Sequence, residues 1–247
     1  MRYDAVLAES VMLRGHHDDL IEGYLARPLA PGPYGSVVVI HHMPGYDRAT
    51  KEMVRTFAVN GFPALCPNLH FRDAPGAAPG EAASAVRAAG GVPDDRLVGD
   101  VAGAADALRA LTSTNGKVGV IGYCSGGRQA FLAACRLSLD AAVDCYGAFV
   151  ASRPEGLPLR VEPVIGLAAD LSCPLLGLFG AEDVHPRPEE VAEIDRVLTA
   201  EGKVHEFHTY EGAGHAFFAV DRPSYRPHAA TDGWRRALEW FERYLTT

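Results

Sequence analysis

The chain has 247 residues, of which 48% are apolar and 22% charged, so it can bury a sizeable core. We expect one domain over residues 1–247, because α/β folds reach this length undivided. The 23 Lys and Arg against 31 Asp and Glu give a net charge of −8, which argues against nucleic acid or an anionic membrane as a partner. No stretch approaches the roughly 20 apolar residues of a membrane span, and no signal-peptide pattern opens the chain. We therefore expect a cytoplasmic protein.

Five cysteines are present, an odd number, and they are widely spaced. No two of them form a CxxC pair, so a disulfide scaffold and a cysteine-rich zinc site are both disfavoured. We expect free thiols, one of which could be reactive. The five are Cys66, Cys124, Cys135, Cys145 and Cys173.

The first elements in chain order are a hairpin, a strand, a helix and a second strand. Residues 5–28 read as two extended pieces around a polar turn, an antiparallel hairpin at a sheet edge. The β-branched run 36–41 predicts a strand buried on both faces. Asp47 can cap a helix that ends near Ala58, and residues 62–66 predict the next strand.

The rest of the chain continues this alternation after one irregular stretch. Residues 73–93 are rich in Ala, Gly and Pro without an apolar face, which predicts a surface excursion. A longer helix begins at Asp94. Alternating strands and helices predict a mostly parallel sheet with helices on both faces and ligands at the carboxyl ends of the strands. The later strands are expected at 118–121, 141–143, 175–179 and 204–210, and the later helices at 126–137, 191–198 and 234–245.

The run Gly122–Gly127 follows a predicted strand and matches the G-x-S-x-G nucleophile elbow, with Cys124 in the serine position. A nucleophile on a tight strand-to-helix turn adopts a strained backbone, and only glycine fits two residues before and after it. The N-terminus of the next helix favours a thiolate. We favour a nucleophilic Cys124 over a small buried packing residue.

A cysteine nucleophile needs a base, and the base needs an orienting carboxylate. Asp183 and His215 each follow a later strand, in the chain order expected of a hydrolase: nucleophile, acid, histidine. Glu182 is the competing acid and His185 the competing base. We prefer His215 because the glycines around it permit close approach.

These motifs resemble those of the dienelactone hydrolase family, over about residues 5–245. The resemblance implies an α/β-hydrolase fold, a triad of Cys124, Asp183 and His215, and an Arg72 that faces a substrate carboxylate. The motifs that carry it are Gly122–Gly127, Asp144–Gly147, Gly180–Asp183, Gly212–Phe217 and Cys66–Arg72.

Two positions depart from the family pattern. His42 stands where members that cleave dienelactone have a glutamate, and Ala219 stands where they have a second substrate-binding arginine. Either His42 contacts the thiol or a substrate oxygen, or it is a hydrogen-bonded residue of the pocket wall. We expect His41 to point to the other side of the strand and assign it no function.

The expected reaction is hydrolysis of a small-molecule ester or lactone, without a metal or other cofactor. Cys124, activated by His215, attacks the carbonyl, and the backbone N–H groups of Ser125 and Met43 stabilise the oxyanion. The sequence leaves open whether the enzyme is a monomer or a homodimer.

Further residues are expected around this site. Tyr146 and Phe217 are candidate substrate-binding residues, and Phe218 and Tyr225 are expected to wall the site. Arg128, just inside the elbow helix, is expected to be a structural ion-pair partner.

Two other classes of function share the glycine-flanked cysteine. A cysteine amidotransferase needs a late His-x-Glu pair, but the chain reads His215-Ala-Phe217 and Asp183 would be unexplained. A non-catalytic protein could instead use Cys124 as a redox-sensing thiol. The hydrolase is the leading hypothesis.

Overall fold

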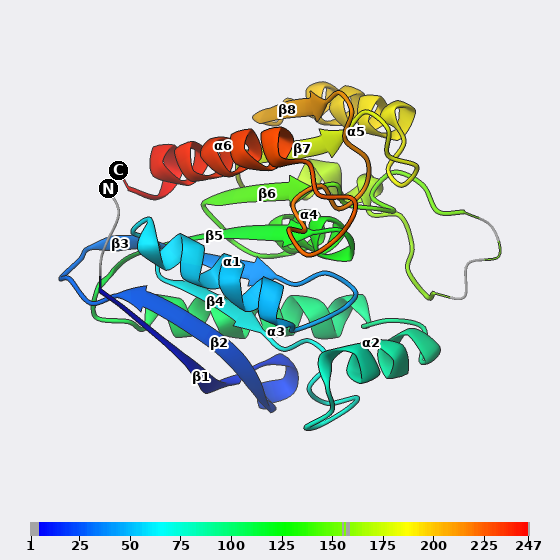
Figure 1. The fold of residues 1–247 in the computed structure, drawn as a ribbon. Helices are drawn as coiled ribbons and strands as arrows, with labels where there is room; N and C mark the ends of the chain where they lie inside the picture. The colour runs from blue at the N-terminus through cyan, green and yellow to red at the C-terminus, as the bar shows by residue number, and fades with distance from the viewer. Residues whose placement is uncertain (1–4, 155, 157–158, 247) are drawn as a thin grey trace.

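The computed structural model describes residues 5–154, 156 and 159–246. Strands and helices alternate along most of the chain (Figure 1). The strands are β1 (Val6–Arg14), β2 (Leu20–Pro28), β3 (Tyr34–Ile40), β4 (Ala64–Pro67), β5 (Thr114–Tyr123), β6 (Ala141–Cys145), β7 (Leu175–Gly180) and β8 (His205–Tyr210). The α-helices are α1 (Arg48–Val59), α2 (Pro79–Ala88), α3 (Asp94–Arg109), α4 (Ser125–Arg136), α5 (Pro188–Ala200) and α6 (Pro227–Leu245), with 3-10 turns η1 (His16–Asp18) and η2 (Ile165–Asp170).

The eight strands form one sheet in the order β1-β2-β4-β3-β5-β6-β7-β8. From β4 through β8 the neighbouring strands are parallel. β1 and β2 pair antiparallel with each other, and β2 pairs antiparallel with β4. The predicted hairpin at the sheet edge is therefore confirmed.

Helices cover both faces of the sheet, as the alternation predicted (Figure 1). Successive side chains of a strand point to opposite faces. Val38 of β3 packs in the core shared with α3, α4 and α5, whereas Val37 and Val39 pack in the core shared with α1 and α6. Because both faces are buried, the β-branched run of β3 suits the middle of the sheet. No helix within the described ranges is long and apolar enough to span a bilayer.

The prediction for residues 73–93 is wrong in part, because α2 lies within this stretch. Pro79 occupies its first turn, where a missing N–H costs nothing. The buried side chains are Ala82, Ala83 and Val86. These are mostly alanines, so the apolar face was too weak to recognise in the sequence.

Candidate active site

The predicted elbow is a sharp turn between β5 and α4. Cys124 has φ 59° and ψ −121°, a region that non-glycine residues rarely adopt. A Cβ atom on Gly122 would lie 1.8 Å from the carbonyl oxygen of Gly126, and one on Gly126 would lie 2.5 Å from that of Ile40. The flanking glycines are therefore required by close backbone approach, and Cys124 stands at the N-terminus of α4.

His215 and Asp183 meet on the loops that follow β8 and β7. Nδ1 of His215 lies 2.9 Å from Oδ2 of Asp183. The other carboxylate oxygen of Asp183 accepts a hydrogen bond of 2.8 Å from the backbone N–H of His185. The Asp183 side chain is completely buried, whereas Glu182 is exposed. This geometry favours Asp183 over Glu182 as the partner of the histidine.

Cys124 is close enough to His215 to raise its pKa, so all three predicted residues come together. Burial lowers the pKa of His215, but the hydrogen bond to Asp183 and the nearby Cys124 outweigh it and raise the pKa to about 10. Since Asp183 engages Nδ1, the Nε2 atom at the tip of the ring is the nitrogen left for the sulfur. The arrangement holds an imidazole between a carboxylate and a thiol.

A small cavity of about 40 Å³ begins beside this turn. Ser125 and Met43, the two predicted oxyanion-hole residues, both line it. Ser125 is the first residue of α4, so its N–H has no carbonyl partner one turn earlier in the helix. The other wall residues are His41, His42, Leu69, His70, Gly91, Val92, Arg128, Gln129, Ala148, Phe149, Leu159 and Val161.

Comparison with known sequences decides the family. The dienelactone hydrolase family pattern matches residues 21–245. The chain belongs to the dienelactone hydrolase family. An Escherichia coli K12 protein named "Putative carboxymethylenebutenolidase" is 33% identical, covering 98% of this chain and 89% of its own length. A Bradyrhizobium protein named "Probable 2-oxo-3-(5-oxofuran-2-ylidene)propanoate lactonase" is 31% identical, covering 90% of this chain and 89% of its own.

The fold agrees with this membership. The crystal structure of a "Putative Dienelactone Hydrolase" from Klebsiella pneumoniae superimposes with a TM-score of 0.86 at 30% identity, covering 98% of this chain and 100% of the other. The predicted α/β-hydrolase fold is confirmed, and the chain is an enzyme of a hydrolase family that acts on lactones and esters. Membership disfavours the amidotransferase and thiol-sensing alternatives.

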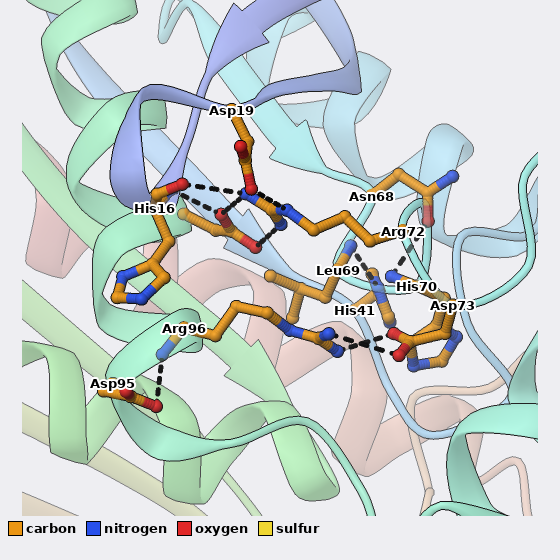
Figure 2. Close-up of polar contacts among 11 residues, drawn as sticks. His16, Asp19, His41, Asn68, Leu69, His70, Arg72, Asp73, Asp95 and Arg96 are labelled. Atoms are coloured by element: carbon orange, nitrogen blue, oxygen red, sulfur yellow. Dashed lines mark hydrogen bonds and ion pairs between the residues drawn. The ribbon is translucent and has the colours of Figure 1, made fainter.

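Arg72, which was predicted to face a substrate carboxylate, is bound instead by carboxylates of the protein itself. Its guanidinium donates to both carboxylate oxygens of Asp100, at 2.8 and 3.0 Å, and to Asp19 at 2.9 Å. Figure 2 shows the side chain directed toward Asp19 and away from the rings of His41 and His70. The Asp100 side chain is fully buried and needs a cation. Arg72 therefore joins the β1–β2 turn to α3.

Tyr146 and Phe217, the two predicted aromatic substrate contacts, are buried and pack beside His215. Tyr146 is 2% exposed and Phe217 is 0% exposed. Neither lines the cavity. The ring of Tyr146 packs edge-on at 5.1 Å from both His215 and Phe217, and Phe217 stacks on Phe218. These aromatic rings support His215 from behind, and Phe218, also buried, does not wall the cavity.

His42 lies on the cavity wall, and its Nε2 atom is 2.8 Å from Oδ2 of Asp47. This is the hydrogen-bonded wall residue that we weighed against a direct contact with the thiol. The expectation for His41 is wrong, because it lines the same cavity. β3 ends at Ile40, so the alternation of side chains does not continue into the two histidines.

His70 is a wall residue that was not predicted from the sequence. It is 4% exposed, and its ring lies edge-on at 4.6 Å from that of His41. Its position just after β4, at the carboxyl end of a strand, was the signal that could have identified it. Arg128 is the structural ion-pair partner expected, since it donates to both carboxylate oxygens of Asp94 at 2.8 Å.

The other four cysteines are buried, as predicted for packing residues. Burial raises the pKa of Cys66, Cys135, Cys145 and Cys173, which keeps each of them a thiol. Cys124 is the partly exposed one of the five.

Proposed function

We propose that this enzyme hydrolyses a small carboxylic ester or lactone through a thioester on Cys124. The observation that carries the proposal is the His215–Asp183 pair beside Cys124, whose thiol stands on the strained elbow. The relatives named "Putative carboxymethylenebutenolidase" and "Probable 2-oxo-3-(5-oxofuran-2-ylidene)propanoate lactonase" support hydrolysis of a lactone or ester bond.

In the first half-reaction the Cys124 thiolate attacks the substrate carbonyl carbon. The electron pair of the carbonyl moves to oxygen, and the backbone N–H groups of Ser125 and Met43 are the proposed donors to that oxyanion. Removing one such donor costs about 2.7–4 kcal/mol in other enzymes. As the tetrahedral intermediate collapses, protonated His215 gives its proton to the leaving alkoxide. The alcohol departs, or in a lactone the ring opens, and a thioester remains.

In the second half-reaction His215 takes a proton from water, and the resulting hydroxide attacks the thioester carbonyl. The same N–H groups stabilise the second oxyanion. Its collapse breaks the carbon–sulfur bond, releasing the acid and restoring the thiolate beside protonated His215. Asp183 holds the ring orientation throughout and stabilises its positive charge.

The test is ester hydrolysis by Cys124→Ala and Cys124→Ser, with Cys135→Ala as the matched control of a buried cysteine in the same helix. We expect the Cys124→Ala variant to lose about 10³-fold or more in kcat/KM, and the Cys135→Ala variant to stay near wild type. Mass spectrometry of acid-quenched wild type should place the acyl group on Cys124. Full activity in Cys124→Ala would refute the proposal. Peroxide oxidation of Cys124 without turnover of any ester would favour thiol sensing.

A further inference from the structure

Four arginines lie on or near the cavity, and two of them, Arg72 and Arg96, are held in ion pairs. Arg160, between the wall residues Leu159 and Val161, is exposed and packs against Gly90, outside the wall itself. Arg72 is bound to Asp100 and Asp19, as described above. Arg96 donates to both carboxylate oxygens of Asp73, at 3.1 and 2.5 Å. Figure 2 shows both guanidinium groups engaged by carboxylates. Each of these positive charges is therefore matched by an acid of the protein itself.

The fourth arginine, Arg128, lines the cavity directly but is equally committed. It is 3% exposed. Nη1 and Nη2 donate to Asp94, and Nε and Nη2 donate to the carbonyl oxygen of Glu162 at 3.2 and 2.6 Å. A planar guanidinium bound in this bidentate way presents little free donor capacity to a ligand.

Two of the wall histidines, His41 and His70, add no compensating positive charge to the cavity. His41 donates from Nδ1 to the carbonyl oxygen of His42 at 2.8 Å, and its Nε2 accepts from the N–H of Leu69 at 3.3 Å, which fixes a neutral ring. Burial lowers the pKa of His41 to about 3 and that of His70 to about 4. Both rings are therefore uncharged at neutral pH.

The carboxylate of Asp47, bound to the wall residue His42, also acts against an anion. Asp47 binds His42, and although burial raises the pKa of Asp47, hydrogen bonds from His42 and Thr50 lower it to about 2. The carboxylate is therefore charged at neutral pH. The apolar wall residues are Met43, Leu69, Val92, Ala148, Phe149, Leu159 and Val161.

We propose that this cavity, which begins at Ser125 beside Cys124, is the acyl pocket of the hydrolase, and that it takes an uncharged acyl group and discriminates against one that ends in a carboxylate. This inference rests on the proposed function. A carboxylate moved from water into an apolar wall without a free cation loses its hydration with little in return. Among the wall residues that the structure describes, Arg128 is the single arginine or lysine, and it is already paired. Arg222, on the loop between His215 and α6, is exposed and is not part of this wall.

The test compares two p-nitrophenyl esters of equal chain length, the valerate and the glutarate half-ester, with spontaneous hydrolysis subtracted. We expect kcat/KM to be at least about 100-fold higher for the valerate. Equal rates, or a preference for the glutarate half-ester, would overturn the inference while leaving the hydrolase intact. If that preference disappeared in Arg222→Gln, the anion contact would lie on the His215 loop. Turnover of neither ester would instead overturn the proposed function, and the inference with it.

A variant tests the electrostatic cause. Asp94→Asn removes the charge that neutralises Arg128, so the glutarate-to-valerate ratio of kcat/KM should rise about tenfold. The matched control is Asp106→Asn, which removes an exposed acid of the same helix paired with Arg109, and it should leave the ratio unchanged. Circular dichroism verifies that both variants are folded. If Asp94→Asn does not fold, Asp73→Asn replaces it as the test variant, because it removes the acid that neutralises Arg96. An unchanged ratio in a folded Asp94→Asn protein would contradict the role given to Arg128.

Discussion

Two histidine–aspartate pairs lie in this site, and they use opposite nitrogens of the ring. In the first pair, Asp183 binds Nδ1 of His215, the nitrogen nearer the backbone. The tip of that ring stays available for Cys124. In the second pair, Asp47 binds Nε2 of His42, so the tip itself is occupied. A histidine–aspartate pair thus supplies the proposed catalytic base at His215, whereas at His42 it holds a residue of the cavity wall in place.

The carboxylates differ as well in what their second oxygen does. The second oxygen of Asp183 accepts from the N–H of His185 within the same tight loop. That of Asp47 accepts from the N–H of Thr50 at 2.8 Å and thereby caps α1. Asp47 therefore caps α1 with one carboxylate oxygen and binds His42 with the other.

The largest expected difference between the pairs is in turnover. Asp183→Asn leaves His215 without its orienting carboxylate, and we expect kcat/KM to fall by about 10³- to 10⁴-fold. Asp47→Asn is the matched control and should stay within a few-fold of wild type. Steady-state assays with one p-nitrophenyl ester measure kcat/KM of both variants. An equal loss of kcat/KM in the two would contradict the different roles given to Asp183 and Asp47.

A second difference is expected in the pH dependence. Burial lowers the pKa of His215, but Asp183 and Cys124 raise it to about 10, so the imidazolium persists into alkaline solution. kcat/KM should therefore fall only as pH rises toward that value. Without the Asp183 carboxylate the pKa drops, and the alkaline limb of the profile in Asp183→Asn should move down by about 1 to 3 units. A limb at the same pH in both proteins would show that Asp183 does not act on this proton.

A third difference is expected in stability. Asp47→Ala removes a helix cap and should lower the free energy of unfolding by about 1 kcal/mol, whereas Asp47→Asn keeps a capping oxygen and should lose less. The low pKa of Asp47 means that the native state binds fewer protons than the unfolded chain between about pH 4 and pH 2. Its stabilisation is present above this window and is lost as pH falls through it. Urea unfolding at several pH values should show that the free energy of unfolding falls less steeply across this window in Asp47→Asn than in wild type. The same dependence on pH in both proteins would contradict the low pKa given to Asp47.

The smallest expected effect is that of His42→Ala. Because the tip of its ring is bound to Asp47, we expect kcat/KM to change by less than about tenfold and the pH profile to keep its shape. Rates measured across pH in the variant and in wild type provide the check. A shift of either limb of the pH profile of kcat/KM in His42→Ala would mean that His42 acts on the thiol.

The elbow and its partners were accessible from sequence because their constraints are local. The glycines two residues from Cys124 are demanded by contacts of under 3 Å within one turn. Asp183 and His215 each follow a strand, and a parallel sheet brings the carboxyl ends of its strands to one edge. The order of residues along the chain was therefore enough to bring them together.

The cavity wall could not be predicted in the same way, because its chemistry depends on distant partners. Nothing in the Pro67–Arg72 segment indicates that Arg72 is bound by Asp100 of α3. Phe217 lies two residues from His215, but its direction follows from rings on other elements, such as Tyr146. The two segments without a readable pattern, 73–93 and 151–170, do contribute to the wall, through Val92 and Val161 among others.

Arg128 has a consequence for local opening of the molecule. Arg128 lies on α4, four residues after Cys124. Its side chain binds Asp94 in the first turn of α3 and the carbonyl oxygen of Glu162, the residue after the wall residue Val161. Hydrogen bonds from a charged donor are about twice as strong as neutral ones. The stretch that carries Val161 is thus hydrogen-bonded to the helix that follows the nucleophile, and local unfolding of this stretch must break those bonds.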